Sequence, residues 1–168
     1  LLHMVNHSMF KLLLFMSAGV VYMNMHKLDF NDIRGFGRKK PVLMVCFLIG
    51  FLGIIGLPGF SGYISKTLIH ESIVEKIWLF HDYSNASTFF QIVEAIFTLS
   101  GGLTAAYMTK LFVAIFIEKN NTDQAKLDAK KNYMKPMSTI ALVASAVMIP
   151  VFGIFPQQTF MKVADFGK

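Results

Sequence analysis

The sequence predicts an all-α integral membrane protein with about four transmembrane helices, one of them discontinuous. Of its 168 residues, 54% are hydrophobic and only 15% are charged, whereas about a quarter of the residues in an average soluble domain are charged. The mean hydropathy is +0.52. The charged residues stand in short blocks between long apolar stretches, which is the pattern of bilayer spans joined by loops.

Three of the apolar stretches have the length of a single membrane crossing, which needs about 20 apolar residues. They cover residues 1–23, 88–117 and 137–155. Because the chain begins inside the first stretch, at Leu1, we expect it to start at an interior point of a longer protein. Within these 168 residues we expect one membrane domain, 1–168.

The remaining stretch, residues 41–80, is too long for one crossing. As a continuous helix it would measure about 60 Å, and the hydrocarbon core is only about 30 Å thick. Three glycines and a proline interrupt its middle, and proline breaks helix hydrogen bonding. These residues are Gly56, Pro58, Gly59 and Gly62. They predict two half-helices joined by an unwound segment near 56–62, an arrangement that builds ion sites in membranes. A kinked span followed by an interfacial helix is the alternative.

Basic residues predict the orientation of the spans. Two loops are rich in them, the first with Lys27, Arg34, Arg38, Lys39 and Lys40, and the second with Lys119, Lys126, Lys130, Lys131 and Lys135. Residues 80–88 contain no lysine or arginine. By the positive-inside rule the basic loops face the cytoplasm or matrix, and both ends of the chain face the outside.

The first span carries three ionisable side chains on one face. His3, His7 and Lys11 follow one another at i+4 spacing, which keeps them on the same side of a helix. Ionisable groups inside membranes are costly and usually face the interior of a bundle. The three side chains are therefore candidates for a proton relay. The alternative for Lys11 is a static ion pair with a carboxylate on another helix.

A second ionisable pair follows the predicted helix break. Lys66 lies four residues after Gly62, and His70 lies one turn further along the same face. The N-terminal end of the second half-helix carries partial positive charge, which favours proton exchange at Lys66 over a permanent charge. The alternative is that Lys66 anchors the half-helix at an interface. Glu94, near the outer end of the third span, either borders a water path or reaches the surface.

The sequence offers no site for a bound cofactor or metal. Cys46 is the single cysteine, which excludes an intrachain disulfide and a cysteine-rich metal site. The histidines show no zinc-type pairing with cysteine or carboxylate, and no dinucleotide-binding fingerprint is present. We also expect no binding to nucleic acid, because the net charge of +6 comes mainly from the two membrane-flanking loops.

Several of these motifs resemble one family. The pattern His3-x-x-x-His7-x-x-Phe10-Lys11 resembles a helix signature of antiporter-like membrane subunits. Such subunits occur in respiratory complex I, membrane-bound hydrogenases and Mrp-type Na⁺/H⁺ antiporters. Residues 56–66, GLPGFSGYISK, are similar to the family's broken helix with its lysine, and residues 103–110, LTAAYMTK, to its next helix.

The resemblance implies proton translocation as part of an antiporter-like subunit of a complex-I-like NADH dehydrogenase or a hydrogenase. Lys66 would be the terminal lysine of the proton path, which His3, His7 and Lys11 feed and His70 continues. The chain would correspond to the last four of about fourteen helices and would itself carry no electrons. A subunit of an Mrp-type Na⁺/H⁺ antiporter and a non-conducting structural subunit are the alternatives.

The resemblance also implies partners and a location. The partners would be other membrane subunits, including the preceding helices of the same subunit, with H⁺ and in the alternative Na⁺ as the transported ion. Thr67 stands where the largest complex I subunit of this type commonly has aspartate, which favours a hydrogenase-type, Mrp-type or bacterial complex-I-like relative. We therefore favour a prokaryotic cytoplasmic membrane over the mitochondrial inner membrane.

Overall fold

The computed structural model describes residues 2–27, 29–81, 84–120, 124–129 and 132–154. Within these ranges every regular element is a helix, which confirms the predicted all-α class. In chain order the elements are α1 (Leu2–Met25), α2 (Phe30–Ile33), α3 (Pro41–Ile55), α4 (Ser61–Leu79), α5 (Ser84–Phe112), the π-helix η1 (Val113–Ile117), α6 (Gln124–Ala129) and α7 (Pro136–Ile154). Four residues used in the sequence argument, Leu1, Lys130, Lys131 and Phe155, lie outside the described residues.

Three of the described helices are long and apolar enough to cross a membrane. They are α1, α5 continued through η1, and α7. The 15-residue helix α3 is also apolar but shorter, about 22 Å at 1.5 Å per residue. A hydrocarbon core of about 30 Å is longer than α3 alone, and the chain continues beyond it into α4. The prediction of about four spans with one discontinuous helix is confirmed.

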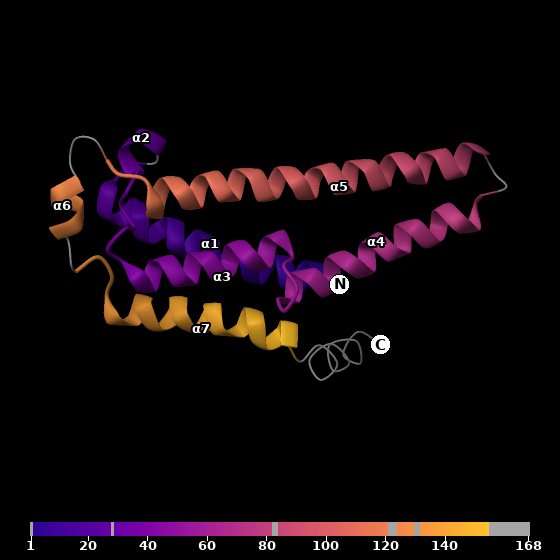
Figure 1. Cartoon of the computed structure of the whole chain (residues 1–168). Helices are drawn as coiled ribbons and strands as arrows, with labels where there is room; N and C mark the ends of the chain where they lie inside the picture. The colour runs from indigo at the N-terminus through magenta and orange to yellow at the C-terminus, as the bar shows by residue number, and fades with distance from the viewer. Residues whose placement is uncertain (1, 28, 82–83, 121–123, 130–131, 155–168) are drawn as a thin grey trace.

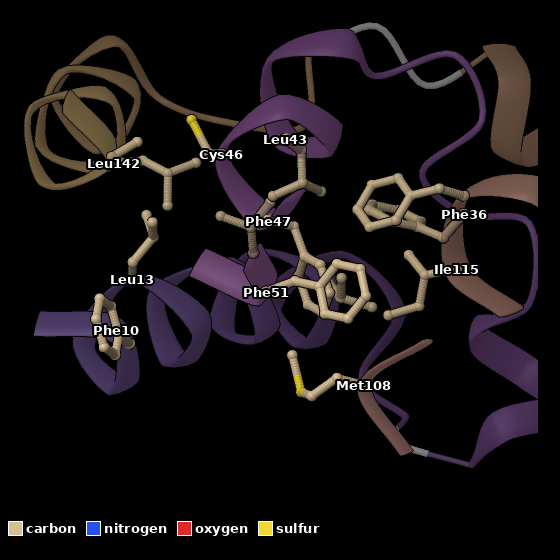
Figure 2. Packing of buried hydrophobic residues seen from close by; sticks show 14 of the residues in the cluster. Phe10, Leu13, Phe36, Leu43, Cys46, Phe47, Phe51, Met108, Ile115 and Leu142 are labelled. Carbon is tan, nitrogen blue, oxygen red and sulfur yellow. The ribbon is translucent and has the colours of Figure 1, made fainter. Parts of the chain in front are cut away.

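Helix α3 lies at the centre of the bundle and packs against α1, α4, α5 and α7. Figure 2 shows Phe47 and Phe51 of α3 reaching toward Met108 of α5 and Ile115 of η1. Each of these four side chains is buried. Burying a large apolar side chain against other helices gives close packing, which holds membrane helices together once they are in lipid. This packing fixes α3, and therefore the position of the break at its end.

Glycines make the break between α3 and α4 possible. Gly56 ends α3 with φ +87° and Gly59 has φ +94°, backbone conformations that glycine adopts at little cost. The amide of Leu57 donates to the carbonyl of Leu52, and the amide of Gly56 bonds the same carbonyl, so the last turn of α3 is satisfied. Pro58 lies between the two glycines in the non-helical segment. The chain then re-enters helix at Ser61.

Helices α4 and α5 form an antiparallel pair. In Figure 1 they run side by side and extend beyond the ends of α3 and α7, on the side where the N-terminus lies. The start of α4 lies beside the start of α1. The ionisable residues of α1 and α4 are therefore brought to the same end of the bundle.

The first basic loop closes the opposite end of α5. The amides of Gly35 and Gly37 donate to the carbonyls of Ala114 and Ile115 in η1. Arg38 donates to the carbonyl of Ile117 at 2.9 Å. Arginine is well suited to carbonyls at a helix C-terminus, which carries partial negative charge. The first basic loop thus has a defined structure that caps the C-terminal end of η1.

Lys40 differs from the other cations of this loop because its side chain is buried, with 2% exposure. Its Nζ donates to the carbonyls of Phe36 at 2.7 Å and Leu127 at 3.1 Å. The rings of Phe36 and Tyr133 lie 4.1 and 5.6 Å from Nζ, which stabilises the cation further. Lys40 therefore ties α6 and the segment before α7 to the start of α3.

A second contact holds α6 to the first loop. Asp128 accepts a hydrogen bond from Gln124 and pairs with Lys39 at 3.2 Å. The Gln124 hydrogen bond, followed by the effect of Lys39, holds the pKa of Asp128 below its ordinary value. The Asp128 carboxylate therefore stays ionised at neutral pH, and its contacts with Gln124 and Lys39 persist at that pH.

Candidate functional site

The ionisable residues of α1 line a cavity between α1, the break and α5. The cavity has a volume of about 390 Å³. His3, His7 and Lys11 line it from α1, and Lys66 lines it from the first half of α4. The rings of His3 and His7 lie 5.9 Å apart. Four of the five predicted pathway residues therefore share one cavity.

Lys66 reaches back across the break to the first half-helix. Its Nζ donates to the carbonyl of Ile55 at 3.0 Å, and its stem packs against the backbone at Gly56. Ile55 is the last residue of α3, where unsatisfied carbonyls give the helix end partial negative charge. The Lys66 ammonium therefore has a favourable acceptor in the Ile55 carbonyl. The sequence predicted only the positive end of α4 near Lys66 and not this acceptor.

Two side chains of α1 hold the first turn of α4 in place. His3 Nδ1 lies 3.0 Å from Ser65 Oγ. The fully buried Asn6 donates from Nδ2 to the carbonyl of Ser61 at 3.0 Å. In the described structure Asn6 Oδ1 has no hydrogen-bond partner, a position suited to an ordered water. Asn6 was missed by the sequence argument because an asparagine between two histidines gives no periodic signal.

Helix α5 supplies the polar wall that faces the charged side chains. Four of its cavity-lining residues carry hydroxyl groups, namely Thr98, Ser100, Thr104 and Tyr107. Hydroxyl groups donate and accept hydrogen bonds without carrying charge. A wall of this kind can order water beside protonatable side chains, which is what proton transfer through a cavity requires.

His70, the fifth predicted pathway residue, does not line this cavity. Its Nε2 lies 3.1 Å from Oε1 of Glu94 on α5, within range of a hydrogen bond, and of an ion pair when the ring is protonated. Both side chains are partly exposed, at 44% and 34%. The structure thus places His70 beside Glu94, which the sequence predicted either to border a water path or to reach the surface.

The cavity lysines have no carboxylate partner within the part of the chain that the structure describes. The ion pairs found there involve Lys27, Arg34, Lys39 and His70. Lys11 Nζ instead lies 5.9 Å from the centre of the Phe15 ring. A static ion pair for Lys11 or Lys66 would need a carboxylate that lies outside the described residues. Among the described residues no cluster of histidine, cysteine and carboxylate side chains has the composition of a metal site.

The fold and the cavity together define a class of protein, an integral membrane helix bundle with a broken helix and protonatable side chains in its interior. The comparison with protein families names the family. The sequence profile described as "NADH:quinone oxidoreductase/Mrp antiporter, TM" matches residues 1–90. The chain belongs to this family of antiporter-like membrane subunits, as the resemblance predicted.

The relatives come from the three kinds of assembly that the resemblance named. Formate hydrogenlyase subunit 3 of Escherichia coli is 26% identical over 153 residues, which cover 88% of this chain and 24% of the relative. Na⁺/H⁺ antiporter subunit A1 of Staphylococcus saprophyticus is 28% identical, over 92% of this chain and 19% of the relative. NADH-quinone oxidoreductase subunit L of Rickettsia typhi is 31% identical, over 91% of this chain and 22% of the relative. The chain thus spans 19–24% of the length of these relatives.

Proposed function

We propose that this chain forms part of a proton path through an antiporter-like subunit of a multi-subunit membrane assembly. The observation that carries the proposal is the shared cavity, in which His3, His7, Lys11 and Lys66 face a hydroxyl-lined wall of α5. Side chains that can both hold and release a proton, spaced along a cavity inside a membrane bundle, are the parts of a proton relay.

The arrangement suggests a direction along the cavity. Protons would pass from Lys11 through the two histidines to Lys66, where the carbonyl of Ile55 stabilises the ammonium. Lys11 lies two turns deeper in α1 than His3, so the series runs toward the end of the bundle where α4 begins. The partners would be other membrane subunits, because the relatives are named as subunits of hydrogenlyase, antiporter and quinone oxidoreductase.

The replacement Lys11→Met tests the proposal against the structural alternative. Methionine keeps the length of the side chain and removes the proton-carrying group, so we expect the assembly to form and its proton flux to fall by at least about tenfold. The flux is measured in vesicles that hold the purified complete assembly, as the rate of internal pH change under an imposed membrane potential. Leu12→Met, an exposed neighbour on the same helix, is the matched control and should keep wild-type flux.

The opposite pattern would favour a structural subunit. In that case Lys11→Met would prevent assembly, because an ion pair with another subunit would be lost. An assembled Lys11→Met variant with wild-type flux would contradict the proposed path. Repeating the assay with and without Na⁺ separates a proton path from Na⁺/H⁺ exchange, an alternative that the similarity to antiporter subunits supports.

A further inference from the structure

The His70–Glu94 pair lies just beyond the cavity, on the side away from Lys11. His70 follows Lys66 by one turn of α4, about 6 Å along the helix axis. Its hydrogen bond to Glu94, at 3.1 Å, joins α4 to α5. A proton that leaves Lys66 in the direction of α4 therefore meets this pair next.

The ring of Phe97 lies next to both the cavity and the pair. Phe97 lines the cavity on one side, and its ring centre lies 6.4 Å from that of His70 on the other. Phe97 is also one turn of α5 from Glu94, so it stands between Glu94 and the hydroxyl-lined wall. We expect this apolar ring to interrupt a continuous chain of water between the cavity and the His70–Glu94 pair.

The orientation predicted by the positive-inside rule puts the pair near the outer boundary of the bilayer. Glu94 is about 24 Å from Lys110 along α5, at a rise of 1.5 Å per residue, and Lys110 precedes the basic, inward-facing end of that helix. The hydrocarbon core is about 30 Å thick. With exposures of 44% and 34%, His70 and Glu94 are placed to exchange protons with outside water.

We propose that His70 and Glu94 together receive the proton from Lys66 and release it to the outside, with Phe97 as the barrier that separates the pair from the cavity. This inference rests on the proposed function and extends it to a release site. In each cycle the Lys66 ammonium loses one proton and becomes a neutral amine, the pair gains that proton and gives one to outside water, and Lys66 is reprotonated from the cavity. No electron is transferred in any step.

An ion pair that only joins two helices would behave differently. Partly exposed ion pairs contribute little to stability, so removal of one carboxylate would leave assembly and proton flux unchanged. A release group, in contrast, limits the flux when it is removed, because the Lys66 proton then has no acceptor. Proton flux and the thermal stability of the assembly therefore distinguish the two roles.

The test uses the complete assembly in vesicles and compares Glu94→Gln with Glu71→Gln. Glutamine is nearly isosteric with glutamate and still accepts a hydrogen bond, but it does not carry the proton. We expect Glu94→Gln to lower proton flux by at least about tenfold, and Glu94→Asp to restore part of it. Glu71 is an exposed carboxylate on α4 next to His70 in sequence, and Glu71→Gln should keep wild-type flux.

Two further variants make the outcome decisive. Phe97→Ala should raise the passive proton leak of the vesicles, since water would then reach from the cavity to the pair. If Glu94→Gln does not assemble, His70→Gln serves in its place with the same expected loss. Wild-type flux in the assembled variant of the pair overturns this inference. Lys66→Ala, measured in parallel, separates the two proposals, because normal flux in that variant overturns the proposed function itself.

Discussion

Replacement of Lys66 by alanine is expected to abolish proton translocation and to leave the assembly intact. Lys66 lines the cavity from the first half of α4, next to the helix break, and its Nζ donates to the carbonyl of Ile55 at 3.0 Å. Among the described residues that line the cavity, Lys66 is the one on α4, so without it the histidines of α1 lose their proton acceptor on that helix. Loss of a group that transfers protons typically costs about 10²–10⁴-fold in rate, so we expect flux to fall by at least about a hundredfold. The measurement is the rate of internal pH change in vesicles that contain the complete assembly.

Two companion variants show whether proton release, and not charge alone, is required. Lys66→Arg keeps a cation near the Ile55 carbonyl, but arginine does not deprotonate in proteins, and we expect it to block flux as alanine does. Lys76→Ala removes an exposed lysine near the end of the same helix and should have little effect. Wild-type flux in Lys66→Arg would show that Lys66 does not release its proton during transport.

Sequence reasoning could predict the discontinuous helix because its cause is local. Gly56 permits, and Pro58 imposes, backbone conformations that no neighbouring helix has to supply. The shared face of His3, His7 and Lys11 was predictable for the same reason, since i+4 spacing alone places them together. In both cases the prediction needs only residues that lie within one short segment of the chain.

Other features depend on how helices meet, and the sequence alone does not show this. In the sequence Lys40 is one of five basic residues in the first loop. In the structure its Nζ donates a hydrogen bond to the carbonyl of Leu127, which is 87 residues away. Glu94 becomes a partner of His70 only through the register between α4 and α5. The polar groups that α5 contributes to the cavity are hydroxyl groups and not charges, so nothing in its sequence distinguishes it from an ordinary membrane helix.

Gly62 in the first turn of α4 is expected to be the most sensitive glycine of the break. A Cβ added there would overlap the carbonyl oxygen of Gly53 in α3, which is backbone and has little freedom to move. Alanine would therefore push α4 away from α3. Overpacking of this kind typically costs about 1–3 kcal/mol, and here it would also draw Lys66 away from the Ile55 carbonyl. We expect Gly62→Ala to lower both the thermal stability of the solubilised assembly and its proton flux.

Gly102→Ala is the matched control for this substitution. Gly102 lies inside α5, with no atom of the described residues within 4 Å of an added Cβ, and alanine is favoured over glycine inside helices by about 1 kcal/mol. The control should therefore keep flux and stability. If Gly62→Ala also keeps both, α3 and α4 do not need their close contact to hold Lys66 in place. If Gly62→Ala assembles with normal stability but loses flux, the contact between α3 and α4 is needed to position Lys66 and not to stabilise the fold. In that case Gly62 affects transport only through the first turn of α4, the half-helix that carries Lys66.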